Sequence, residues 1–224
     1  MQIDVWSDVV CPWCYIGKRR LEAALARVDR PVSVVWHSFQ LDPNAPRESS
    51  TNLEEMLAKK YGMSPGQARS MQERVTAVAA EAGLAYRLDR ARPENTFDAH
   101  RLLQWASSLG QGPALTERLM KAYFVDGERI GDRATLARLA GEIGLDPEEA
   151  AKVLADESSH ADAVRADVTR ARDIGVRGVP FFVVDGKYGI SGAQEVAVLE
   201  QAIRQALAEA PAAGPGCDDG SCEV

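Results

Sequence analysis

The motif Cys11-Pro12-Trp13-Cys14 constrains the fold of this chain more than any other feature. It comes a few residues after Ile3-Asp4-Val5-Trp6, whose alternating apolar side chains predict a short strand. From Pro12 onward, apolar residues recur at three- and four-residue steps. This spacing predicts a helix that carries Cys14 on its apolar face and stops before Pro31. The two thiols are therefore expected at a strand-to-helix junction.

The rest of the chain has strand-like ends and a helical middle. Residues 32–39 predict a second strand, and residues 179–184 with the turn Asp185-Gly186 predict a late β-hairpin. Ser191-Gly192-Ala193-Gln194 resembles a capping box and predicts a helix from there to Glu209. Helices are also predicted after the capping box Ser64-Pro65-Gly66-Gln67, over 97–109, 115–124 and 136–143, and from Asp146.

This order of elements predicts an α/β protein in which the two ends of the chain build one layered structure. The helices between them would form an all-helical insertion. We expect residues 1–42 and 168–210 in the α/β part, residues 43–167 in the insertion, and residues 211–224 as a flexible C-terminal tail.

Composition excludes several classes of partner. Of 224 residues, 46% are hydrophobic and 26% charged, which is an ordinary globular balance. The net charge of −7 argues against a nucleic-acid surface or a polybasic membrane patch. No apolar run approaches the ~20 residues of a membrane helix, and the first residues lack the pattern of a signal peptide. We therefore expect a cytoplasmic protein with no nucleic-acid or membrane partner.

A dithiol at the start of a helix suits thiol–disulfide exchange. The thiolate is the nucleophile, and the unpaired N–H groups and positive dipole end of the helix stabilise it. The three-residue spacing brings Cys14 close enough to form a disulfide with Cys11. We expect Cys11, at the exposed end, to attack the substrate, and Cys14, on the apolar face, to resolve the mixed disulfide.

Val179-Pro180 is the second part of the expected site. A cis bond before Pro180 would present a backbone edge that can pair with an extended substrate. Pro12, Trp13 and Val179 are expected to contact that substrate. The aromatic side chains of Tyr15, Phe181 and Phe182 either line the same surface or pack internally.

Three stretches resemble the FrnE-like branch of the DsbA family: Trp6 to Lys18, Asn95 to Arg101, and Gly175 to Phe182. The resemblance extends over nearly the whole chain. It implies a thioredoxin-like fold with an inserted all-helical domain, disulfide exchange on protein substrates, and a cis-proline at Pro180. His100 lies in the second stretch, so it is either a substrate-binding residue or a histidine that makes structural hydrogen bonds.

The residues between the cysteines depart from one branch of that family. They are proline and tryptophan here, whereas periplasmic DsbA has proline and histidine. DsbA is a strong oxidant, near about −120 mV, because its reduced form is stabilised. Without that histidine we expect a less oxidising site, suited to reduction or isomerisation.

Cys217 and Cys222 form a second pair near the end of the chain, where Gly220 permits a turn between them. The pair is either an auxiliary dithiol that exchanges with the first or an exposed tail that oxidises incidentally. A zinc site made by all four cysteines is a further alternative. It is less favoured, because the pairs lie at opposite ends of the chain and Cys14 should be partly buried.

A second enzyme class shares the implied fold. Hydroxychromene-carboxylate isomerases and kappa-type glutathione transferases resemble this chain but typically carry serine as the key residue, so Cys11 and Cys14 favour redox chemistry. We expect no metal and no cofactor, with glutathione as a co-substrate under this alternative. The expected partners are protein disulfides or small-molecule thiols, and a homodimer is an open alternative.

Three polar residues complete the predicted set. Asp4 lies in the strand that leads to the motif, so it is a candidate buried proton acceptor for Cys14. His37 ends an apolar strand and is expected to pack or lie in a loop. His160 lies among polar residues and is expected at the surface.

Overall fold

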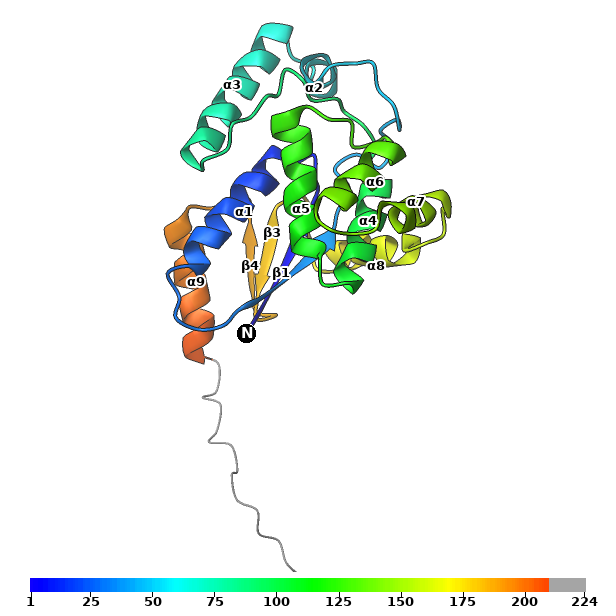
Figure 1. Ribbon diagram of the computed structural model, residues 1–224. Helices are drawn as coiled ribbons and strands as arrows, with labels where there is room; N and C mark the ends of the chain where they lie inside the picture. Colours follow the sequence, from blue (N-terminus) through cyan, green and yellow to red (C-terminus); the bar gives the residue numbers. More distant parts are fainter. Residues whose placement is uncertain (210–224) are drawn as a thin grey trace, which may run out of the picture.

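The structure is a computed structural model that describes residues 1–209. Its elements follow the predicted order, with most of the helices between the second and third strands (Figure 1). They are β1 (Gln2–Ser7), α1 (Pro12–Leu25), β2 (Ser33–Ser38), α2 (Leu53–Tyr61), α3 (Pro65–Glu81), α4 (Phe97–Ser108), α5 (Gly112–Lys121), the π-helix η1 (Ala122–Asp126), α6 (Arg133–Glu142), α7 (Pro147–Ala155), α8 (Ala161–Asp173), β3 (Phe181–Val184), β4 (Tyr188–Ser191) and α9 (Val196–Glu209).

The four strands form one sheet in the order β2-β1-β3-β4. β1 pairs in parallel with β2 and antiparallel with β3, and β3 continues into β4 as the predicted hairpin. The hairpin turns at Asp185 and Gly186, which both have positive φ, and the Lys187 amide closes the turn by donating to the Val184 carbonyl at 3.0 Å. The predicted α/β class is confirmed.

Helices cover both faces of this sheet, and successive side chains of β1 point to opposite faces. Ile3 and Val5 point to the face that α1 and α9 cover, where they join a buried cluster with Leu21 and Phe182. Trp6 points to the opposite face and packs against Ala171 of α8. The direction in which each β1 side chain points decides which of them can reach the cysteines.

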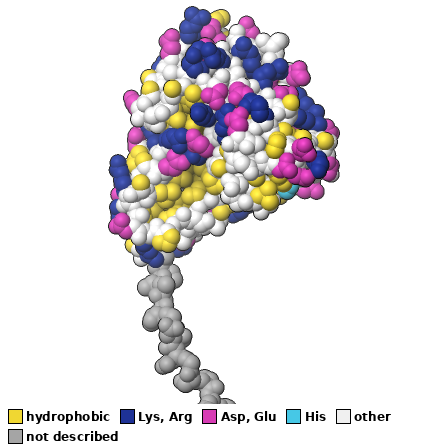
Figure 2. All heavy atoms as spheres, in the orientation of Figure 1, with side chains coloured by type: hydrophobic (Ala, Val, Ile, Leu, Met, Phe, Trp, Pro, Cys, Tyr) yellow, Lys and Arg dark blue, Asp and Glu magenta, His cyan; other side chains and the backbone are white. Residues whose placement is uncertain are grey.

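The helical block from α2 to α7 has its own buried contacts and joins the first turns of α1 in a common core. Arg101 on α4 is fully buried, and its guanidinium donates to backbone carbonyls of Val153, Leu154 and Asp156 at the end of α7. Figure 2 shows basic and acidic side chains interspersed over this block, and an apolar area between α1 and α5. None of the helices within residues 1–209 is long and apolar enough to span a membrane.

The structure corrects two sequence predictions. Ser191 to Gln194 do not cap a helix: Ser191 ends β4, and the Gln194 side chain donates back to the Ser191 carbonyl, so α9 begins only at Val196. The predicted domain boundary between residues 167 and 168 falls inside α8, which packs against both α4 and β2. The capping box at Ser64 and Gln67 is confirmed.

Candidate active site

Cys11 and Cys14 flank the start of α1. Cys11 is the N-cap residue, with extended backbone angles, and Pro12 opens the helix. The Cys11 amide donates to the Asp8 carbonyl at 3.1 Å, and the Cys14 amide donates to the Cys11 carbonyl at 3.0 Å. Both side chains are free thiols. The predicted strand-to-helix placement of the dithiol is confirmed.

Both thiols are covered by their surroundings. Cys11 is 3% exposed and Cys14 is 1% exposed, whereas Trp13 between them is 40% exposed. The expectation that Cys11 lies at an exposed end is therefore wrong. The physical reason is the loop before β3, because the Cys11 thiol donates to the Val179 carbonyl at 3.3 Å and lies against that backbone.

The surroundings of Cys14 favour its protonated form. Burial raises the pKa of the Cys14 thiol well above its ordinary value, and the adjacent Cys11 side chain raises it further. The Ser7 hydroxyl and the Asp8 backbone lower it by smaller amounts. Cys14 therefore holds its proton until a base can take it.

The Val179-Pro180 bond is cis, and Pro180 is buried against α1. A side chain at Gly17 would place a Cβ 3.0 Å from Pro180 Cγ and 3.3 Å from Phe182 Cζ. Glycine at this position lets α1 lie against the proline loop. Of the two aromatic residues that follow, Phe182 belongs to the core, and Phe181 is half-buried against Trp6.

Tyr86 reaches the motif from the segment between α3 and α4. Its hydroxyl donates to the Pro12 carbonyl at 2.8 Å, and its ring stacks on Phe124 at 4.7 Å and lies 6.2 Å from Tyr15. Tyr86 is absent from the predicted site, because nothing local in the sequence marks a tyrosine in an irregular segment as a contact of residue 12. The aromatic group holds the first turn of α1 against the helical block.

His100 and Asp8 form a buried pair beside the motif. His100 Nε2 lies 3.2 Å from Asp8 Oδ1, and the other Asp8 oxygen accepts from the Leu41 amide at 2.8 Å. The side chains of His100 and Asp8 are 2% and 1% exposed. This burial argues against direct contact between His100 and a substrate, and it favours the hydrogen-bonding alternative.

The prediction that Asp4 serves Cys14 is wrong. Strand alternation turns Asp4 toward the face of Trp6, away from α1. There Asp4 Oδ1 lies 2.6 Å from His37 Nε2, and His37 Nδ1 lies 2.9 Å from Asp167 Oδ1 of α8. Burial lowers the pKa of His37, but the hydrogen bonds with Asp167 and Asp4 outweigh it and raise the pKa. His37 thus packs, as expected, within a cluster that joins β1, β2 and α8.

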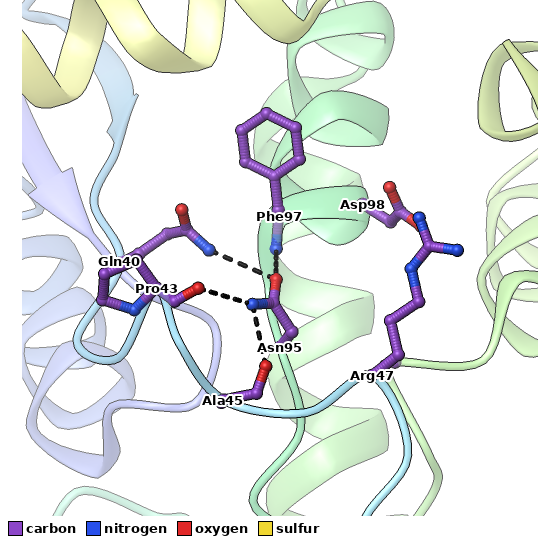
Figure 3. A pocket seen from close by; sticks show the side chains of 8 residues that line it. Gln40, Pro43, Ala45, Arg47, Asn95, Phe97 and Asp98 are labelled. Atoms are coloured by element: carbon purple, nitrogen blue, oxygen red, sulfur yellow. Dashed lines mark hydrogen bonds and ion pairs between the residues drawn. The ribbon is translucent and has the colours of Figure 1, made fainter. Parts of the chain in front are cut away.

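The segment around Asn95 lines a cleft of about 300 Å³ (Figure 3). The Asn95 amide donates to the carbonyls of Pro43 and Ala45, and its oxygen accepts from the Phe97 amide. Across the cleft, Arg47 lies 3.6 Å from Asp98. These hydrogen bonds join the loop after β2 to the start of α4.

Other predicted groups lie elsewhere. His160 is the half-buried residue that precedes α8, with left-handed backbone angles. Cys217 and Cys222 lie outside the described residues. Within residues 1–209, no three His, Cys, Asp or Glu side chains are arranged to hold a metal ion.

The sequence of this chain matches a known protein family. Residues 2–204 match the model of the DSBA-like thioredoxin domain. A probable DsbA oxidoreductase from Streptomyces coelicolor is similar in structure, with 42% sequence identity, a TM-score of 0.92, and coverage of 100% of this chain and 99% of that one.

Two more distant structures share the fold. The cytosolic disulfide reductase DsbM from Pseudomonas aeruginosa, solved with GSH, has 19% identity and a TM-score of 0.66, covering 93% of this chain and 100% of that one. A 2-hydroxychromene-2-carboxylate isomerase has 16% identity and a TM-score of 0.70, covering 92% and 95%.

Proposed function

The chain belongs to the DSBA-like thioredoxin domain family, and from this premise we propose that it exchanges disulfides on protein substrates through Cys11 and Cys14. One observation carries the proposal: two free thiols flank the first turn of α1, and the first of them contacts the backbone of Val179, directly before Pro180. A nucleophile and a backbone edge for an extended substrate therefore lie side by side.

The two cysteines take different roles in the proposed reaction. The Cys11 thiolate attacks a substrate sulfur, so that a mixed disulfide forms and one substrate thiol leaves. Cys14 then loses its proton, attacks Cys11 and releases the second substrate thiol. The enzyme gives up two electrons and two protons and is left with the Cys11–Cys14 disulfide. A reducing thiol restores it, and the reverse sequence oxidises a substrate dithiol.

The high pKa of Cys14 supports this division of roles, since a thiol that stays protonated is a poor first nucleophile. Cys11 has the N-cap position, where the amides of the first helical turn face it. Its burial is compatible with attack if the substrate takes the place of the Val179 carbonyl as partner of the sulfur.

The proposed substrate surface surrounds the exposed indole of Trp13. Trp13 and Leu41 are 40% and 39% exposed, so both can contact a substrate. Leu41 belongs to the loop that is tied to Asp8. Half-buried Pro12 and Val179 complete the proposed contact with an unfolded or extended segment of protein.

Insulin reduction by dithiothreitol tests the proposal. Wild type should accelerate precipitation of the insulin B chain, and Cys11→Ser should lower turnover to the rate of dithiothreitol alone, because no nucleophile remains. Cys14→Ser should accumulate the mixed disulfide, which mass spectrometry detects. The double variant Cys217→Ser/Cys222→Ser is the matched control, since it also removes two thiols but leaves the main pair intact.

Two results of the insulin assay would change this assignment. Wild type no faster than dithiothreitol alone would remove protein disulfides as substrates, and glutathione-dependent isomerisation of small aromatic molecules would become the leading alternative. Slower turnover of the tail variant would support a proposed relay from Cys11 and Cys14 to Cys217 and Cys222. We place the protein in the cytoplasm, whose reducing thiols would keep Cys11 and Cys14 in the free form.

A further inference from the structure

A small cavity with a mixed polar and apolar lining lies between the end of β1, the end of β2 and the helices α4 and α5. Its volume is about 20 Å³, and its lining includes Ser7, His37, His100, Gln104 and Thr116. A polar cavity needs roughly 10–15 Å³ to hold a water molecule, which then takes two to four hydrogen bonds. This cavity therefore has the size and the lining to hold one water.

Ser7 connects the cavity to the dithiol. Strand alternation turns Ser7 to the same face of β1 as Ile3 and Val5, toward α1. The residue is 6% exposed, and its hydroxyl has no partner of good hydrogen-bond geometry among the described residues. The hydroxyl nevertheless lies close enough to the Cys14 sulfur to lower the pKa of that thiol. A hydroxyl both accepts and donates, so it can pass a proton from Cys14 into the cavity.

His100 of α4 also lines this cavity. Its Nε2 faces the Asp8 carboxylate at 3.2 Å, and Asp8 is held in place by the Leu41 amide. A carboxylate on one ring nitrogen orients the imidazole and leaves the other nitrogen as a proton acceptor. His37 lines the same cavity, but both of its nitrogens are already paired with Asp4 and Asp167.

We propose that Ser7, one water molecule in this cavity and the Asp8–His100 pair form the path by which Cys14 loses its proton when it resolves the mixed disulfide. This inference rests on the proposed function. The ionisable groups around the path are Cys14, Asp8, His100, His37 from β2, and Tyr123 from η1, whose pKa is raised by burial and by the Asp8 charge.

The Cys14 S–H bond breaks, and the proton passes through Ser7 and the water to His100. The electron pair left on the Cys14 sulfur forms the bond to Cys11. The bond between Cys11 and the substrate sulfur breaks, and its electron pair leaves on that sulfur, which takes a proton from solvent. His100 returns its proton when the disulfide is reduced again.

A chromogenic aromatic disulfide, 5,5′-dithiobis(2-nitrobenzoate), separates the two steps. All variants carry Cys217→Ser and Cys222→Ser, so that Cys11 and Cys14 are the two thiols left in the chain. The first coloured thiolate released then reports the attack by Cys11, and the second reports resolution by Cys14. Ser7→Thr and Ser7→Val have side chains of the same shape, and only the first keeps the hydroxyl. We expect Ser7→Thr to retain both phases within about twofold. Ser7→Val and His100→Gln should slow the second phase alone by roughly 10²-fold, the usual contribution of a general base.

The pH profile separates a proton path from a packing role. In Ser7→Val and His100→Gln the pH profile of the second phase should lie at higher pH than in wild type, because Cys14, whose pKa burial raises, would then lose its proton without an internal acceptor. Equal second phases in Ser7→Thr and Ser7→Val would overturn the path through Ser7. An unchanged second phase in His100→Gln would show that His100 is not the proton acceptor, whether or not Ser7→Val folds. If wild type shows no first phase, the proposed function fails instead.

Discussion

At the scale of single residues, Cys11 and Cys14 are both buried, so their different roles must come from the atoms that each sulfur contacts. Cys11 lies against the Val179 carbonyl. Cys14 lies deeper, next to Ser7 and the backbone of Asp8, where desolvation keeps it protonated. Trp13 is the residue of the motif that is exposed to solvent. Of the two residues between the cysteines, it is the one that departs from the proline and histidine of the DsbA motif.

We predict that Trp13→His makes the site more oxidising. A protonated imidazole in the first turn of α1 would stabilise the reduced, thiolate form, and each ~1.4 kcal/mol of stabilisation raises the potential by about 30 mV. Equilibration with glutathione buffers measures this shift, and Trp13→Phe, which adds no charge, should match wild type. A wild-type potential already near about −120 mV would contradict the expectation of a less oxidising site.

At the scale of elements, α1 is positioned by close contacts on several sides. Gly17 brings it against the loop of Pro180, and the Tyr86 hydroxyl holds the carbonyl of its first residue. Leu21 and Ala24, one and two turns further on, pack into the sheet cluster. The dithiol is therefore held by backbone contacts as much as by side chains.

Gly17→Ala should move α1 away from the proline loop. The added Cβ meets Pro180 at 3.0 Å, and overpacking of this kind costs about 1–3 kcal/mol. We expect a lower free energy of unfolding in urea and slower insulin reduction, because the distance between Cys11 and Val179 changes as well. Gly66→Ala in α3 is the control: a Cβ there meets nothing within 4 Å, so it should raise stability by about 0.4–1 kcal/mol. Equal effects of the two substitutions would contradict this account.

At the scale of the whole molecule, the helical block is joined to the α/β part by polar clusters as well as by the common core. Glu117 of α5 accepts from Lys18 at 2.6 Å and from Tyr15 at 2.5 Å, and it also pairs with Arg19. Asp167 of α8 joins β2 through His37 and accepts from Gln104 of α4 at 2.6 Å. Nothing in these links requires a second chain, and the homodimer stays a prediction.

We expect the contribution of Glu117 to depend on pH. Burial raises its pKa, but the hydrogen bonds from Lys18 and Tyr15 outweigh it and lower the pKa below the ordinary value. Such a group stabilises the fold above its unfolded-state pKa, near 4.3, and the stabilisation is lost as pH falls through the lower folded-state pKa. Glu117→Gln should therefore cost roughly 1–2 kcal/mol at pH 7, after allowance for partial exposure, and little near pH 3.

Urea denaturation at pH 7, 5 and 3 measures this difference, with Glu149→Gln as the control. Glu149 pairs with Lys152 at the surface, so its replacement should change nothing measurable at any of the three pH values. A cost of Glu117→Gln that is the same at pH 7 and pH 3 would show that the carboxylate charge contributes nothing to the link between the two parts.

Local patterns in the chain were enough to predict the α/β class, the hairpin, and the dithiol at the start of α1, because strand alternation, turn residues and helix starts are written in neighbouring residues. The same patterns failed where contacts between distant segments set the burial or the direction of a side chain. The burial of Cys11 depends on a carbonyl 168 positions away. Tyr86 reaches Pro12 from an irregular segment, and Asp4 faces α8 rather than α1. The Asp8–His100 pair and the cavity behind Cys14 exist because α4 packs beside the end of β1, and spacing along the chain carries no record of that contact.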